Sequence, residues 1–208
     1  MHNCFQDGCI CYSFGINDDV SWDLFFAKRN HPVYMYDHTI EKLPYENSNF
    51  IWEKIGICGE KSGSYDGCLL TLEDILEKNG HQNYEGMILK MDVEGAEWNV
   101  FSKINPDILK CFDQIVLEMH GLWNLSLREK ILETFRRLNR FHQLVHIHGS
   151  NGSFVIESGS RNIPNIIEMT YVNRKGRKFI KSSRFFPTQI DEKNNGILPE
   201  IVLGFWNE

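Results

Sequence analysis

Strand-like and helix-like segments alternate along this sequence from its beginning. This alternation is typical of an α/β domain with a mostly parallel sheet. Apolar, β-prone segments predict strands at residues 9–16, 33–37, 49–57, 87–93 and 114–120. The fourth of these is apolar at nearly every position, as expected for a central strand covered by helices on both faces.

Amphipathic helices are expected between the strands. One opens at Ser21 and carries an apolar stripe at helical spacing. Thr71 with Asp74 resembles a capping box and predicts a helix that ends near Gly80. Ser126 with Glu129 resembles a second capping box, at the start of a long amphipathic helix.

Two further strands, at about residues 143–148 and 166–172, follow without an obvious helix between them. That break predicts an antiparallel pair. Residues from 174 onward are first basic and then rich in Pro and Asn, which indicates an ordered extension. The sequence therefore predicts one domain over residues 1–208, with a core at about 9–173 and a C-terminal extension at 174–208.

Composition narrows the class of protein. The chain has 22 Lys plus Arg against 28 Asp plus Glu, and a net charge of −6 argues against a nucleic-acid partner. We expect a cytoplasmic protein without a membrane span, because no apolar run approaches the roughly 20 residues that cross a bilayer. The six cysteines include no C-x-x-C pair. Cys4, Cys9 and Cys11 could form a zinc knuckle, although their spacing favours simple packing.

In open parallel sheets, ligands bind beyond the carboxyl ends of the strands. Here those ends are polar and mainly acidic: they carry Gly15, Asp37, Ile57, Asp92, Glu118 and His120. Gly15 precedes Asp37 by 22 positions, which suits a turn and carboxylate that bind an adenosine-containing cofactor. The alternative is that the glycine only relieves a tight turn and the aspartate caps a loop.

The turn after the first strand lacks the further glycines of a pyrophosphate-binding loop, and Asp18 and Asp19 would repel phosphates. A cofactor that is positively charged near this turn, such as a sulfonium with an ammonium group, fits better.

Asp92 and Glu118 end strands that we expect to be neighbours, about 4.8 Å apart. Two carboxylates so close require a compensating group. This could be a substrate or cofactor, a divalent ion, or His120, which could instead act as a neutral base on a substrate hydroxyl. The alternative is that Asp92 and Glu94 cap the following helix.

Three other groups of residues carry weaker signals. His146 and His148 end a strand and are best interpreted as structural histidines. The basic run at residues 174–184 is interpreted as a solvated face, and could instead hold a phosphorylated substrate. Four aromatic side chains could line an acceptor pocket, although packing is the better interpretation: Trp123, Phe185, Phe186 and Trp206.

The stretches YSFGINDDVSWD, VYMYDHTI, LKMDVEGAEW and QIVLEMHG, in this order, resemble the successive motifs of the FkbM-type S-adenosylmethionine-dependent methyltransferases. The resemblance implies a class I methyltransferase fold, with a seven-stranded sheet that contains one antiparallel strand. It also implies O-methylation, often of sugars or other glycan and metabolite precursors. Members usually carry more chain before the first strand than this sequence does.

The resemblance assigns roles to the strand-end residues. YSFGI would be the cofactor loop, Asp37 the ribose ligand, and Asp92, Glu118 and His120 the floor of the reaction site. We expect cofactor binding by Ser13, Phe14, Gly15, Asp37, His38, Ile57 and Asp92. S-adenosylmethionine is the expected cofactor, with a divalent metal as an open question. The expected partner is a small-molecule or glycan acceptor, and a homo-oligomer is compatible with the sequence.

Two other classes of function remain open. In a nucleotide-sugar-dependent glycosyltransferase, Asp92 and Glu94 would mimic an acid-x-acid metal site. A catalytically silent binding protein could use the same fold.

Overall fold

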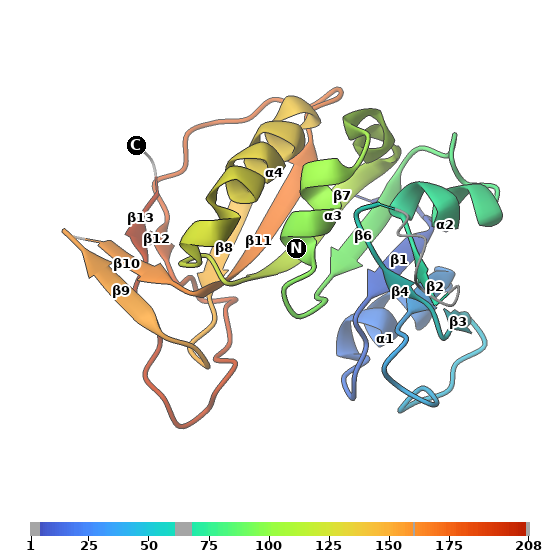
Figure 1. The fold of residues 1–208 in the computed structure, drawn as a ribbon, viewed down its shortest axis with the longest axis horizontal. Helices are drawn as coiled ribbons and strands as arrows, with labels where there is room; N and C mark the ends of the chain where they lie inside the picture. The colour runs from blue at the N-terminus through green and yellow to red at the C-terminus, as the bar shows by residue number, and fades with distance from the viewer. Residues whose placement is uncertain (1–4, 61–67, 160, 207–208) are drawn as a thin grey trace.

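The computed structural model describes residues 5–60, 68–159 and 161–206, which form a central sheet flanked by helices (Figure 1). Seven strands lie in the spatial order β3-β2-β1-β6-β7-β11-β8. Only β11 in this sheet runs antiparallel to its neighbours, so the predicted topology is confirmed. Their bounds are β1 Cys11–Phe14, β2 Val33–Tyr36, β3 Phe50–Glu53, β6 Met87–Met91, β7 Phe112–His120, β8 His142–Gly149 and β11 Ile166–Asn173.

Helices pack on both faces of the sheet, as predicted. The bounds of the helices are α1 Ser21–Ala27, α2 Leu72–Lys78, α3 Glu97–Lys103 and α4 Arg128–Phe141, with 3-10 turns η1 Pro106–Cys111 and η2 Leu125–Leu127. Tyr12 of β1 joins the core that contains Trp98 of α3 and Leu138 of α4. Its neighbour Cys11 faces the other way, toward Phe26 of α1. Successive strand residues point to opposite faces, so one short strand supplies both cores.

The helix predicted from Thr71 and Asp74 is confirmed, because Thr71 caps α2 and both bonds of the capping box form. The capping box expected at Ser126 is wrong. The Ser126 hydroxyl donates to the Asn124 side chain, which also accepts from the Ser126 backbone and caps η2. The long helix α4 then starts at Arg128 without a side-chain cap.

The third predicted strand is also shorter than expected. It ends at Glu53, where the backbone turns, and residues 56–57 form a separate strand, β4 Gly56–Ile57. This strand pairs with β5 Leu69–Leu70 in a small sheet of its own. The connection between β8 and β11 likewise contains a hairpin that was not predicted, formed by β9 Val155–Ser158 and β10 Arg161–Pro164.

The C-terminal extension lies on the β8 side of the sheet (Figure 1). Its two short strands, β12 Phe185–Phe186 and β13 Gly204–Phe205, pair with each other. Phe186, Ile201 and Leu203 of the extension are buried in the main core. Residues 188–203, which we call the C-terminal segment, run between these two strands. Among the described residues, no helix combines the length and apolar character that crossing a bilayer requires.

Candidate active site

Gly15 directly follows β1 and packs against the backbone at the end of β6. Its φ is +76°, and a Cβ at this position would lie 1.5 Å from the Asp92 carbonyl oxygen. Only glycine fits such a turn and such an approach. The Gly15 carbonyl accepts a hydrogen bond from Lys90 Nζ at 2.8 Å, which ties the turn to β6 a second time.

Asp37 follows β2 and organises the same turn. Its carboxylate accepts four hydrogen bonds: from the backbone N–H groups of Ile16 and Asn17 on Oδ2, and from the backbone and hydroxyl of Thr39 on Oδ1. Burial would raise the pKa of Asp37, but these bonds outweigh it and hold the pKa at about 2. Asp37 therefore stays ionised and fixes the loop above β1.

The chain leaves β6 at Met91 and turns sharply. Glu94 has a φ of 53° and Gly95 a φ of 105°. The turn places Asp92 and Glu94 close together, with Glu97 beneath them. Glu97 is fully buried and accepts backbone hydrogen bonds from Val93 and Gly95. The three carboxylates of this stretch thus have different roles: Glu97 holds the turn, the partly buried Asp92 lines the cavity, and Glu94 is exposed.

His120, the last residue of β7, lies at the centre of these carboxylates. Its Nδ1 is 3.2 Å from Glu97 Oε1. Its Nε2 is 3.4 Å from Glu94 Oε2, 3.9 Å from Glu118 Oε1 and 4.0 Å from Asp92 Oδ1. The Trp98 indole donates to the His120 carbonyl oxygen, so backbone and ring are both held.

The titratable side chains of the cluster differ in the causes of their pKa shifts. Burial would lower the pKa of His120, but the bond to Glu97 and the surrounding carboxylates raise it to about 9. Burial, with repulsion from Asp92 and Glu168, raises the pKa of Glu118 to about 7. Burial also raises the pKa of Asp92. His120 is therefore a cation at neutral pH and compensates the carboxylates, whereas Glu118 is the group poised to exchange a proton.

A cavity of about 720 Å³ opens above these strand ends. Of the predicted site residues, it is lined by Phe14, Gly15, Asp37, His38, Ile57, Asp92 and Glu118. The structure places neither Ser13 nor His120 among the lining residues. His120 contacts the lining carboxylates Asp92, Glu94 and Glu118 instead. Ser13 is fully buried on the opposite face of β1, near Asp23 of α1, because strand alternation turns it away from its neighbour Phe14.

The cavity also has lining residues that sequence reasoning missed. Gly56 is one of them, and a Cβ there would collide with the His38 ring at 2.4 Å, so this glycine makes room for His38. Glu168 of β11 and Asn194 of the C-terminal segment line the opposite end. An isolated acidic residue within the apolar strand β11 was the available signal for Glu168, and Asn194 had none.

The weaker sequence signals lie elsewhere. Cys9 and Cys11 are buried in the core beneath α1, and Cys4 lies outside the described residues. In the basic run, Arg177 pairs with Asp113 at the start of β7, and Lys175 pairs with Glu85 ahead of β6. These contacts place the start of the run at the amino ends of the strands, away from the cavity.

The four aromatic candidates have packing partners around the hairpin and the extension. Trp123 packs against Phe154, Phe186 packs against His146, and Phe185 packs against Phe205. The Trp206 indole donates to the Leu203 carbonyl.

The sequence was compared with known families and structures. The model of the methyltransferase FkbM domain matches residues 4–143. The chain belongs to the FkbM methyltransferase family. This membership supports methyl transfer as the class of reaction and implies S-adenosylmethionine as the methyl donor. No curated protein matches the chain.

Solved structures resemble the FkbM chain only distantly. A candidate hemolysin of Streptococcus thermophilus is 13% identical, with a TM-score of 0.45 over 80% of this chain and 60% of its own. A candidate rRNA methylase of Clostridium thermocellum is 9% identical, with a TM-score of 0.46 over 81% and 88%. A candidate S-adenosylmethionine-dependent methyltransferase of Streptococcus mutans is 10% identical, with a TM-score of 0.42 over 82% and 46%. Likenesses this distant add nothing about function.

Proposed function

We propose that this FkbM protein transfers a methyl group from S-adenosylmethionine to a hydroxyl group of a sugar or a similar small polar acceptor. The observation that carries the proposal is the cavity of about 720 Å³, which spans the carboxyl ends of β1, β2, β6 and β7. Cavities of about 300–1,000 Å³ hold small-molecule ligands. Every strand end in this cavity contributes a predicted site residue.

The donor would occupy the part of the cavity between Gly15, His38 and Ile57. S-adenosylmethionine carries a sulfonium and an ammonium group, and the surrounding carboxylates favour a cation. Asp37 already accepts four hydrogen bonds, which uses the roughly four lone-pair sites of a carboxylate. In this proposal a ribose hydroxyl shares one of these acceptors, and the main work of Asp37 is to hold the cofactor loop.

The acceptor hydroxyl would lie between Asp92 and Glu118. In the reaction, the bond from sulfur to the methyl carbon breaks as the acceptor oxygen bonds to that carbon, and the hydroxyl proton passes to Glu118. Alignment of the two reacting atoms supplies most of the rate enhancement. Glu118 suits the role of base because its pKa is raised to about 7. His120 would stay protonated and position the carboxylates.

A divalent cation is an optional part of the proposal. Ligand atoms of Asp92, Glu94 and His120 all lie within 4.8 Å of one another. Glu97 holds Nδ1 of His120 and leaves Nε2 facing the other carboxylates, which is how metal-binding histidines are usually oriented. Binding would require His120 to lose a proton, so the ion and the imidazolium are alternative ways to compensate these charges.

Calorimetry with S-adenosylhomocysteine tests the proposed function. We expect binding in the micromolar range, near −8 kcal/mol. Thermal unfolding of the same sample shows that the protein is folded. Folded protein that gives no heat contradicts the proposal.

Thermal-shift and methyl-transfer assays separate the remaining alternatives. A nucleotide-sugar transferase would be stabilised by a UDP-sugar with manganese, and not by S-adenosylhomocysteine. A silent binding protein would bind S-adenosylhomocysteine without methylating any acceptor pool. Family membership favours the methyltransferase over the glycosyltransferase. We also propose a small acceptor in preference to nucleic acid, because an acidic cavity wall repels nucleic-acid phosphates.

A further inference from the structure

Three polar side chains lie in a row across neighbouring strands at the acceptor end of the cavity. In the strand register, Glu168 of β11 lies opposite Glu118 of β7 on one side and opposite His148 of β8 on the other. Residues directly opposite each other have Cβ atoms about 4.5–5.5 Å apart. Two carboxyl side chains and one imidazole therefore share one face of the sheet.

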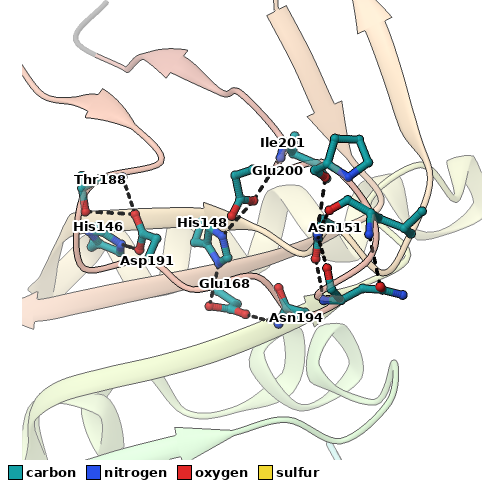
Figure 2. Close-up of polar contacts among 12 residues, drawn as sticks. His146, His148, Asn151, Glu168, Thr188, Asp191, Asn194, Glu200 and Ile201 are labelled. Carbon is teal, nitrogen blue, oxygen red and sulfur yellow. Dashed lines mark hydrogen bonds and ion pairs between the residues drawn. The ribbon is translucent and has the colours of Figure 1, made fainter.

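Glu168 is held in place by two groups from outside its own strand. Its Oε2 lies 3.2 Å from His148 Nδ1, and its Oε1 accepts a hydrogen bond from Asn194 Nδ2 at 2.7 Å (Figure 2). His148 is only 2% exposed, and its Nε2 lies 3.2 Å from Glu200. His148 thus bridges Glu168 to the C-terminal segment, while Glu168 still lines the cavity.

The C-terminal segment that carries Asn194 is anchored at several points. The buried Asn151 side chain donates to the carbonyl oxygens of Asn195, Leu198 and Pro199, and accepts from the Asn195 backbone. His146 Nε2 lies 2.6 Å from Asp191, as Figure 2 shows. Asn194 is consequently presented to the cavity by a fixed piece of chain.

This wall carries net negative charge, because the carboxylates of Glu118, Glu168 and Glu200 outnumber the one imidazole, His148, whose pKa the bond to Glu168 raises to about 9. Glu118 and Glu168 present carboxylates, and Asn194 presents an amide. Lys90, the lysine that lines the cavity, donates to the Gly15 carbonyl at the donor end. A phosphate on the acceptor would meet like charges, which disfavour its binding. Hydroxyl or ammonium groups would instead find hydrogen-bond acceptors.

We propose that Glu168 and Asn194 form the acceptor-binding wall of the cavity, and that they select an uncharged or cationic polyol over a phosphorylated one. The inference rests on the proposed function, since it names the acceptor class of the same site. Glu168 would accept hydrogen bonds from the acceptor, and Asn194 would orient Glu168 and contact the acceptor beside it.

The test uses the full chain saturated with S-adenosylhomocysteine. Methyl glucoside, glucosamine and glucose 6-phosphate are titrated separately, and binding is followed by ligand-observed NMR. We expect both uncharged and amino sugars to bind, and glucose 6-phosphate to bind at least about tenfold more weakly, which corresponds to about 1.4 kcal/mol. Glu168→Gln should reduce that discrimination. Asn194→Ala, at an exposed position where the fold is not at risk, should weaken the binding of methyl glucoside severalfold.

Glu192→Gln, an equal loss of charge at an exposed position of the same segment, is the matched control and should change none of these values. The inference is overturned if glucose 6-phosphate binds as well as methyl glucoside, if neither uncharged nor amino sugar binds, or if Asn194→Ala binds sugars like the wild type. Calorimetry with S-adenosylhomocysteine alone keeps the two proposals apart. If that binding is intact, any of these outcomes overturns only the acceptor wall.

Discussion

Gly15 and Asp92 are in such close contact that a methyl group on the Gly15 α-carbon would lie 1.5 Å from the Asp92 carbonyl oxygen. The turn after β1 and the end of β6 are therefore one packed unit. A change in the first moves the second.

We predict that Gly15→Ala lowers the free energy of unfolding and abolishes S-adenosylhomocysteine binding, because the new methyl group displaces the end of β6. Gly80→Ala is the matched control. Gly80 also has a positive φ, of +73°, but a Cβ there would meet nothing within 4 Å. It should cost only the backbone strain, roughly 1 kcal/mol. Thermal unfolding and calorimetry measure both, and equal effects of the two substitutions would contradict the prediction.

Asp37 gives a pH prediction. Its pKa falls from 3.8 to about 2 on folding, so its contribution to stability is present above pH 3.8 and is lost as the pH falls through about 2. This contribution to the free energy of unfolding is about 1–2 kcal/mol, because solvent at the cavity wall screens the charge. Denaturant unfolding of wild type and Asp37→Asn should differ at pH 6 and converge as the pH approaches 2. A constant difference would show that ionisation of Asp37 is not the cause.

His120 gives the opposite dependence on pH. Its pKa rises from 6.5 to about 9, so its stabilising contribution is complete below pH 6.5 and disappears as the pH rises through 9. His120→Gln should therefore reduce the free energy of unfolding by roughly 2–3 kcal/mol at pH 6, and by much less at pH 10. His38→Gln, at an exposed histidine, is the control substitution. A His120→Gln effect that grows with pH would contradict the assignment of His120 as a cation.

Binding of a divalent ion to the carboxylate cluster can be tested with manganese. If Asp92, Glu94 and His120 bind a divalent ion, manganese should raise the melting temperature more at pH 8 than at pH 6, because the ion displaces the proton of His120. Glu94→Gln should remove this effect. Glu85→Gln, at a carboxylate beside Lys175, should leave it unchanged. If manganese has no effect at either pH, His120 alone compensates the carboxylates.

Asn151 controls the C-terminal segment. Asn151→Asp would place a carboxylate against three carbonyl oxygens that now accept from the amide. We expect faster hydrogen exchange in residues 188–203, with S-adenosylhomocysteine affinity within about twofold of wild type, because the donor end of the cavity lies elsewhere. Asn83→Asp, at an exposed asparagine ahead of β6, is the control. Unchanged exchange in Asn151→Asp would show that other contacts suffice to hold the segment.

Much of the fold could be predicted because its signals are local. Apolar runs and their spacing identified the strands of the sheet and the faces of the helices, and a capping box gave the start of α2. The errors arose where contacts between residues far apart in the sequence determine the local structure. The strand expected over residues 49–57 divides because Gly56 pairs with Cys68 rather than with β2.

The candidate site was predictable at the carboxyl ends of β1, β2, β6 and β7, and not on β11 or the C-terminal segment. Strand ends reveal Gly15, Asp37, Asp92 and Glu118 directly. Ser13 was misplaced because the direction of a side chain depends on where the strand alternation starts. Glu168 reaches Glu118 through an antiparallel register that one sequence does not specify. Asn194 depends on the path of a loop, and the raised pKa of His120 depends on carboxylates from two stretches of chain.

The match to the FkbM domain stops at residue 143, before β11 and the C-terminal segment. The two halves of the cavity are thus encoded in separate stretches, one inside the shared domain and one beyond it. Most of the second stretch is tied into the main core, so Glu168 and the exposed Asn194 are the positions at which one wall of the cavity can vary while the first stretch stays unchanged.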